Sequence, residues 1–485
     1  MDGLVFAGLL APPVIGAAAG LAGGARPRET AWINAVTLPI SLVTAAWAAN
    51  AIAGGRAPFV SGDTWRLDAL SALFALLVSG VCTLAIWAGP GFTAAEAAAQ
   101  AQARTFRIYA NLFTATMLLA VTTSNLGVMW VAIEATTISS ALLIPLHRTA
   151  SSLEASWKYL LIGSVGIALA FTGTVLAFVD YSSAGGAAEA ALHWPSLLAA
   201  APTLHPEVAR LAFVFLLVGF GTKAGLAPMH TWLPDAHAEA PAPLSAMMSG
   251  VLLAVALYAI ARWKAVIDLA AGTPFTDTLL LIVAVITIAV GSLSLLAQRD
   301  YKRLLAFSSI EHMGLACFGL ALGPAGMFAA LLHLTVHAAG KSAAFLLSGR
   351  VLARFRTHEI DGASGLLAAM PITGGLFAAG AVALAGLPPF GLFLSEVLLV
   401  RAGWLAGHEI VTGGVLMLLL VAFASIAWQL HRLLFGTPAA GVSIGERLGW
   451  SMVLVAVPLA GLAWAGVSLP ARAQVLIERA VAVLR

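Results

Sequence analysis

The chain has 485 residues, of which 60% are hydrophobic and only 10% are charged, and its formal net charge is +3. Soluble domains carry about 25% charged residues, so this composition excludes an ordinary soluble enzyme. It predicts an all-α integral membrane protein, because helices satisfy their own backbone hydrogen bonds in lipid. The two cysteines, Cys82 and Cys317, form no CxxC pair, which argues against an iron–sulfur cluster or zinc ribbon held by this chain.

Fourteen apolar segments are long enough to cross a bilayer, which takes about 20 residues. In chain order they lie near 4–22, 31–53, 68–89, 106–123, 125–146, 157–179, 209–228, 244–261, 277–297, 303–322, 325–347, 370–402, 409–431 and 449–469. The twelfth is overlong and contains two adjacent prolines, so we expect two half-helices there. The first starts almost at Met1 with no basic stretch before it, which is typical of a retained helix and not of a signal peptide.

Loop charges predict the orientation of the chain. Loops after odd-numbered spans carry fourteen Lys and Arg residues, whereas the opposite loops and the C-terminal tail together carry nine. By the positive-inside rule the first set is cytoplasmic. We therefore expect a multi-pass protein of a bacterial-type inner membrane with both termini outside.

Two segments 161 residues apart, 224–235 and 385–396, resemble each other, and in each copy Gly and Pro interrupt a helix beside a charge. The residues expected to break the two helices are Gly225, Pro228, Pro388 and Pro389. Because the copies lie five spans apart, the second unit is inverted relative to the first, an arrangement that recurs in transporters. The alternative is that these prolines only kink helices for packing.

The repeat predicts four parts of the chain. Residues 1–105 form helices 1–3, residues 106–262 the first inverted five-helix repeat, residues 277–431 the second, and residues 432–485 the C-terminal helix and tail.

Among the charged residues inside the predicted spans, four are singled out: Glu134, Lys223, Lys341 and Glu396. A charge at the bilayer centre costs about 3 kcal/mol on insertion scales, so such residues typically mark an ion or proton path. A glutamate and a lysine whose separation changes form a two-state proton switch, which we predict for Glu134 and Lys223. The alternative is a static salt bridge that joins two helices.

A second polar group surrounds Lys341. His333, His337 and Lys341 are spaced four residues apart and share one helix face, and histidine titrates near neutral pH, so we predict an auxiliary proton path. A metal site is the alternative, but no carboxylate or cysteine at a suitable spacing completes it, and the lysine repels a cation. The adjacent Glu311 and His312 are expected to point about 100° apart, one toward the central row and the other toward a partner.

The polar stretch between the seventh and eighth spans contains His230, Asp235, His237 and Glu239. Two interpretations remain open. The stretch is either a water-facing funnel that admits protons to Lys223, or an ordered loop whose polar groups satisfy the broken helix.

Residues 221–237 resemble the most characteristic segment of the antiporter-like subunits of respiratory complex I, of multisubunit sodium/proton antiporters and of energy-converting hydrogenases. The similarity continues through 300–309, 333–341 and 386–396 and covers roughly residues 60–430. This resemblance implies fourteen helices with paired inverted repeats.

Within that superfamily, residues 308–314 and 337–342 look most like the F-type component of hydrogenase-4 and formate hydrogenlyase-like complexes. The resemblance implies a proton-translocating subunit in the membrane arm of a redox-driven complex. It implies no redox cofactor in this chain, nickel–iron and iron–sulfur centres in peripheral redox subunits, and other antiporter-like and small membrane subunits as partners. The rival functions are a sodium/proton antiporter subunit without a redox partner, a complex I-type quinone oxidoreductase subunit, and a scaffold that no longer conducts.

Carried over by position, Glu134 and Lys223 resemble the coupled glutamate and lysine of the fifth and seventh helices. Lys341 resembles the central lysine, and Glu396 resembles the exit residue of the twelfth helix. Two departures are evident. Many relatives carry a lysine or histidine in the eighth helix where this chain offers only Ser249, and many have a serine before the histidine in place of the glutamate at position 311. Either water or another residue spans the first gap, or the subunit is not a complete pump.

Overall fold

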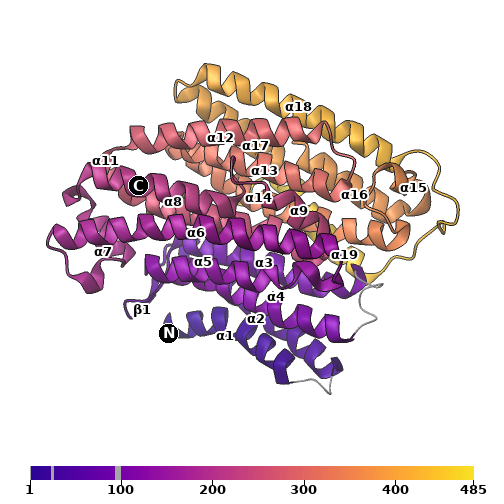
Figure 1. Ribbon diagram of the computed structural model, residues 1–485, viewed down its shortest axis with the longest axis horizontal. Coiled ribbons are helices and arrows are strands. Elements are labelled where there is room, and N and C mark those ends of the chain that lie inside the picture. The colour runs from indigo at the N-terminus through magenta and orange to yellow at the C-terminus, as the bar shows by residue number, and fades with distance from the viewer. Residues whose placement is uncertain (1, 23–26, 93–99) are drawn as a thin grey trace.

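A computed structural model describes residues 2–22, 27–92 and 100–485, and its helices lie side by side in one bundle (Figure 1). The bundle begins with α1 and α2 along one edge and reaches α18 along the other. The elements are α1 (Asp2–Ala22), α2 (Pro27–Ala53), β1 (Phe59–Ser61), β2 (Trp65–Leu67), α3 (Ala69–Phe92), α4 (Gln100–Thr122), α5 (Leu126–Ala141), η1 (Ile144–His147), α6 (Ala150–Ser183), η2 (Ala188–Ala190), α7 (Trp194–Ala200), η3 (Ala201–Thr203), α8 (Pro206–Ala224), α9 (Trp232–Glu239), α10 (Ala242–Met247), η4 (Met248–Leu252), α11 (Leu253–Ala271), α12 (Thr273–Leu295), α13 (Tyr301–Leu320), α14 (Gly323–Phe355), η5 (Asp361–Ala363), α15 (Leu366–Ala369), α16 (Pro371–Leu384), α17 (Gly391–Leu405), α18 (Glu409–Leu434), α19 (Trp450–Val467) and α20 (Ala471–Val483).

Within the described residues, 10 helical segments are long and apolar enough to cross a membrane. The number is 11 if the pair Asp361–Ala369 and Pro371–Leu384, bent by 114°, counts as one span. The chain is therefore a multi-pass helical membrane protein, as predicted, but these criteria do not reproduce the count of fourteen. The predicted spans outside the ten correspond to α4, α8, α13 and the α16–α17 pair. The physical reason is that α8 and α13 each carry three charged residues and α16 and α17 are short.

The predicted helix breaks are confirmed, and α8 and α16 end in the same way. Gly225 (φ 74°) and Gly386 (φ 66°) adopt the left-handed conformation that glycine tolerates. The amide of the following leucine then donates to the carbonyl five residues back, at 2.9 Å in the first break and 3.3 Å in the second. This is the Schellman motif, which satisfies helix-terminal carbonyls. Pro228 and Pro389 follow within the two breaks, before α9 and α17 begin.

The starts of α5 and α13 also match. The side chain of Asn125 and that of Asp300 each accept hydrogen bonds from two backbone amides of the first helical turn. Each cap residue forms an isolated β-bridge to a segment that follows the next long helix, Asn125 with His193 and Asp300 with Glu359. Equivalent anchors therefore hold α5 and α13.

Glycines allow the helices that carry buried charges to approach closely. A Cβ at Gly166 of α6 would lie 2.5 Å from the Cβ of Thr222, the neighbour of Lys223 on α8. A Cβ at Gly291 of α12 would lie 2.7 Å from the Cβ of Glu311 on α13. Small residues at such contacts let membrane helices pack backbone to backbone, which fixes the depth and direction of the charged side chains.

A buried ion pair joins Asp68, the residue between β2 and α3, to Arg262 of α11. Arg262 donates to both carboxylate oxygens of Asp68 at 2.7 Å and to the Ser71 hydroxyl at 2.9 Å. The Arg262 side chain is 5% exposed and that of Asp68 is 1% exposed. If one partner of such a pair is removed, the other charge remains buried without a counter-charge, which is destabilising.

We therefore expect Asp68→Asn to lower the free energy of unfolding by about 3–5 kcal/mol. Denaturant titration of the purified protein in mild detergent measures this. The matched control is Glu207→Gln, because Glu207 pairs with Arg210 at 2.8 Å but its side chain is 83% exposed; the control should change stability by less than about 1 kcal/mol. Equal effects of the two substitutions would contradict the assignment.

Candidate functional site

The first polar group joins α5, α6 and α8. The Glu134 carboxylate accepts hydrogen bonds from the hydroxyls of Thr137 and Ser164, each at 2.9 Å. The Lys223 ammonium is fully buried, donates to the Tyr159 hydroxyl at 3.3 Å and lies 4.7 Å from the centre of its ring. A lysine and a glutamate are thus both held by hydroxyl groups of the same helix, α6.

Glu134 and Lys223, both within the described residues, form no ion pair within 4 Å of each other. The structure therefore shows the predicted pair in a separated arrangement, with Tyr159 beside the lysine. Tyr159 also hydrogen-bonds to Ser140 of α5 at 2.8 Å, so it connects the two helices. Sequence reasoning missed Tyr159. The available signal was its position about one helical turn before Gly163 and Ser164, on a span otherwise rich in Ala and Leu.

The second polar group is built on α13, α14 and α17. His312 Nδ1 lies 3.1 Å from His333 Nε2, and His333 Nδ1 lies 2.9 Å from the Ser395 hydroxyl. The ring centres of His312 and His337 are 4.9 Å apart. All three imidazoles are fully buried. The prediction that His333 and His337 share one face of a helix is confirmed, and their ring centres lie 6.3 Å apart.

Lys341 lies further along α14. Its ammonium donates to the Leu305 carbonyl at 2.8 Å and to the Ser308 hydroxyl. Both acceptors belong to α13, so a single buried lysine joins the two helices that carry the histidines. Ser308 contributes here although sequence reasoning assigned it no role.

Two expectations about this group are wrong. Glu311 and His312 do not diverge: the Glu311 carboxylate lies 3.7 Å from His312 Nδ1, and both side chains are buried in the central row. The long Glu311 side chain spans the angle between adjacent helical positions. We also expected that no carboxylate completes a metal site with the histidines. Glu396 of α17 does lie near them: one of its oxygens is within 4.8 Å of a ring nitrogen of His312 and of His333.

A pair of hydroxyls lies beside the acceptors of Lys341. Ser249 lies in η4, a π-helical turn, and its hydroxyl is 2.7 Å from that of Ser309. Ser309 donates to the Leu305 carbonyl at 3.0 Å, the same oxygen that accepts from Lys341. Within the described residues, no hydrogen bond or ion pair joins Lys223 to this second group.

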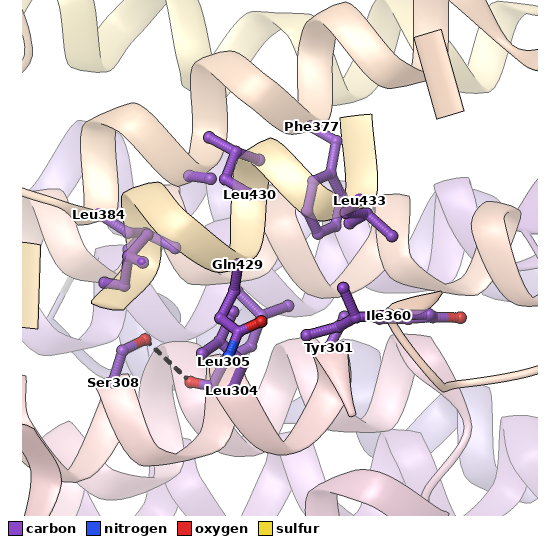
Figure 2. A pocket seen from close by; sticks show the side chains of 12 residues that line it. Tyr301, Leu304, Leu305, Ser308, Ile360, Phe377, Leu384, Gln429, Leu430 and Leu433 are labelled. Carbon is purple, nitrogen blue, oxygen red and sulfur yellow. Dashed lines mark hydrogen bonds between the residues drawn. The ribbon is translucent and has the colours of Figure 1, made fainter. Parts of the chain in front are cut away.

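A small cavity lies beside the acceptors of Lys341 (Figure 2). Its volume of about 20 Å³ suffices for one water molecule, which needs roughly 10–15 Å³. The lining is mostly apolar, but the Ser308 hydroxyl faces the Leu305 carbonyl at one end and the Gln429 amide lies nearby (Figure 2).

The stretch that contains α9 is ordered, and its polar residues separate into two sets. Asp235 forms ion pairs with Lys158 at 3.2 Å and with Arg303 at 2.7 Å near the surface. His237 is fully buried, and its ring stacks 5.0 Å from that of Phe345 on α14. His237 therefore packs against α14. The funnel toward Lys223 is one of the two open interpretations of this stretch, and the other is an ordered loop.

A larger cavity of about 210 Å³ lies at the end of α9, where residues of α6, α13 and α14 also line it. Its charged and titratable lining residues are His147, Glu239, Lys302 and His358. Lys302 is buried, and its ammonium donates to the carbonyls of residues 238 and 240, at 2.8 Å and 2.6 Å, on either side of Glu239. The cavity has room for several waters, each of which occupies roughly 30 Å³ in the liquid.

The transmembrane family described as NADH:quinone oxidoreductase/Mrp antiporter matches residues 123–424, which include both polar groups. The chain belongs to this family.

Two relatives and one solved structure narrow the comparison. The chain is 40% identical to the hydrogenase-4 component F homologue of Methylacidiphilum infernorum (isolate V4) over 336 residues, 68% of this chain and 70% of that protein. It is 31% identical to hydrogenase-4 component B of Escherichia coli (strain K12) over 70% of this chain but only 51% of that protein. A chain of the membrane-bound sulfane sulfur reductase, an archaeal respiratory membrane complex, shares the fold with a TM-score of 0.89 and 24% identity, over 99% of this chain and 97% of that one.

The large cavity predicts a pH effect on stability. Burial, and then the nearby Lys302 ammonium, lowers the pKa of His358 from 6.5 to about 4. In the unfolded chain His358 binds a proton below pH 6.5, whereas in the folded chain it does so only below about pH 4. Because the unfolded state binds more protons between these values, the free energy of unfolding falls as the pH drops from 6.5 to 4. We expect His358→Gln to flatten the fall in melting temperature between pH 6.5 and pH 4. An unchanged slope would contradict the neutral state of the partly buried His358.

Proposed function

We propose that this chain is a proton-translocating, antiporter-like subunit in the membrane arm of a redox-driven complex of the hydrogenase-4 or formate hydrogenlyase type. The observation that carries the proposal is the pair of buried lysines, Lys223 and Lys341, each hydrogen-bonded inside a helical bundle that crosses the membrane. Family membership and 40% identity to a hydrogenase-4 component F homologue support it.

In the proposed path, Glu134 and Lys223 exchange a proton in the first half, and Lys341 passes one through His337, His312 and His333 to Glu396 in the second. Moving one charge against a potential of about 150 mV takes about 3.5 kcal/mol. Rearranging a buried charge pair involves free energies of several kcal/mol. This is comparable to the free energy needed to move one proton against the potential. The peripheral redox partner supplies this energy and holds the nickel–iron and iron–sulfur centres.

The fourteen-helix arrangement is part of the proposal. Residues 106–262 and 277–431 form two inverted five-helix repeats, flanked by the three helices of 1–105 and by the helix and tail of 432–485. The matching caps at Asn125 and Asp300 and the matching helix ends support the repeat. In this arrangement α4, α8, α13 and the broken α16–α17 pair also cross the membrane.

The proposed orientation follows from the loop charges, with both termini outside a bacterial-type inner membrane. The 210 Å³ cavity lined by His147, Lys302 and His358 then opens on the cytoplasmic side. His237 lies two residues before the cavity-lining Glu239, and its ring stacks on Phe345 of α14, the helix that carries Lys341. Cytoplasmic protons therefore enter the second half through this cavity and His237, while His230, at the break after α8, remains a candidate on the first half.

Partner subunits are proposed at both ends of the path. Glu134 and Glu396 are each partly exposed on an apolar helix surface, next to Val131 and Ile138 on α5 and to Phe393 and Val397 on α17. A carboxylate facing lipid is costly. Neighbouring antiporter-like or small membrane subunits that cover these faces satisfy both residues.

We expect Lys223→Ala and Glu134→Gln each to reduce redox-driven proton uptake at least about tenfold, because each removes a proton-transfer group. Uptake is measured with a pH-sensitive dye in membrane vesicles. The matched control is Glu154→Gln, which removes a carboxylate that is 65% exposed on α6. Full uptake by either path variant would show that the assigned path is wrong.

Purification of the native assembly in mild detergent separates the proposed function from its rivals. We expect peripheral redox subunits to copurify, with stoichiometric nickel and iron. Iron without nickel would indicate another redox-driven complex, including a complex I-type quinone oxidoreductase. Recovery of membrane subunits alone, without either metal, would favour a sodium/proton antiporter, a function supported by the Mrp members of the family.

A further inference from the structure

We propose that His312, His333 and Glu396 form a binding site for a divalent transition metal ion of the zinc class, and that an ion bound there blocks the path through α14. The blocking effect rests on the proposed function, whereas the binding does not.

The spacing of the donor atoms fits a tetrahedral ion. Zinc bound at 2.0–2.2 Å places two ligand atoms roughly 3.4 Å apart. His312 Nδ1 and His333 Nε2 are 3.1 Å apart. A Glu396 oxygen lies within 4.8 Å of one ring nitrogen of each histidine. The three ligands come from α13, α14 and α17, so the ion joins three helices with only small side-chain movements.

Hydrogen bonding orients His333 for metal binding. The Ser395 hydroxyl donates to the Leu392 carbonyl at 2.8 Å, so it accepts from His333 Nδ1 at 2.9 Å. The proton of His333 is therefore on Nδ1, and the lone pair of Nε2 faces His312. A supporting contact of this kind, which fixes the tautomer of a ligating histidine, accompanies most histidine–metal sites.

The second ligand requires a change of tautomer. With the proton of His333 on Nδ1, its Nε2 is an acceptor, and His312 Nδ1 is then the donor across the 3.1 Å contact. That proton must leave His312 Nδ1 before an ion can bind between the two rings. His312 Nε2 is buried and has no hydrogen-bond partner among the described residues. The ring can therefore carry its proton on Nε2, which leaves Nδ1 free to bind the ion without a net loss of protons.

The local charge suits a divalent ion. Glu396 is one carboxylate, and Glu311, whose oxygen lies 3.7 Å from His312 Nδ1, is a second, so the two together balance a 2+ charge in a buried place. Repulsion by Lys341 is limited because its ammonium is directed to Leu305 and Ser308 of α13. Two imidazoles select zinc, copper or nickel over magnesium, calcium or sodium, which prefer oxygen ligands.

The position of the site explains the block. Both imidazoles of the proposed relay between His337 and Glu396 become ligands, so neither can pass a proton while the ion is bound. Glu396 is partly exposed whereas the two histidines are buried, so Glu396 is the outermost of the three ligands.

The test uses zinc chloride added to the purified assembly that contains the full chain, with X-ray absorption at the zinc edge and equilibrium dialysis. We expect one zinc per chain, coordinated by two imidazole nitrogens and carboxylate oxygen at about 2.0–2.2 Å. His333→Gln should lose this zinc, and the surface control His431→Gln should keep it. Ser395→Ala retains every ligand and should weaken zinc binding about 10–100-fold.

Equal zinc binding by wild type, His333→Gln and Ser395→Ala, or a spectrum without imidazole nitrogen, overturns the site. If His333→Gln fails to assemble, the wild-type spectrum and Ser395→Ala still decide. Zinc at concentrations above the dissociation constant measured by dialysis should also abolish proton uptake. If zinc binds but proton uptake continues, the proposed blocking effect is wrong. If the assembly translocates no protons at all, the proposed function fails while the binding result stands.

Discussion

A charged side chain in the interior of a membrane bundle must find its hydrogen-bond partners within the protein, because lipid supplies none. Both central lysines obey this constraint, but with different partners. Lys223 donates to a phenol on α6, and Lys341 donates to a carbonyl and a hydroxyl on α13. The close helix contacts at Gly166 and Gly291 bring these neighbouring helices within reach. Close packing of the helices is therefore what allows each lysine to reach its hydrogen-bond partners.

The two halves of the molecule use the same backbone devices but different chemistry. Equivalent caps begin α5 and α13, and equivalent glycine turns end α8 and α16. The first half then holds one lysine and one glutamate among hydroxyls, whereas the second gathers three histidines and two glutamates around its lysine. In the proposed path, equivalent helix scaffolds therefore support a proton exchange between one glutamate and one lysine in the first half. In the second half they support a longer proton relay through three histidines.

Local features of the sequence predicted the membrane class, the helix breaks and the shared face of His333 and His337, because periodicity and proline act over a few residues. Contacts between distant segments were not predictable in the same way. Glu396 meets the histidines only because α17 folds back on α14, and His237 reaches Phe345 because α9 turns away from α8. The Glu311 contact with His312 depends on a side-chain conformation that helix geometry alone does not determine.

Lys223 lies in the last turn of α8, one residue before the helix ends at Ala224, whereas Lys341 lies in the middle of α14. The carboxyl end of a helix carries a partial negative charge of roughly half an electron, and its influence is confined to the last turn. A shift of the break after Ala224 therefore changes the electric field at Lys223 directly, without any movement of the lysine side chain. A displacement of α9 that moved this break would change the electrostatic potential at Lys223, whereas Lys341, in the middle of α14, would lie outside its range.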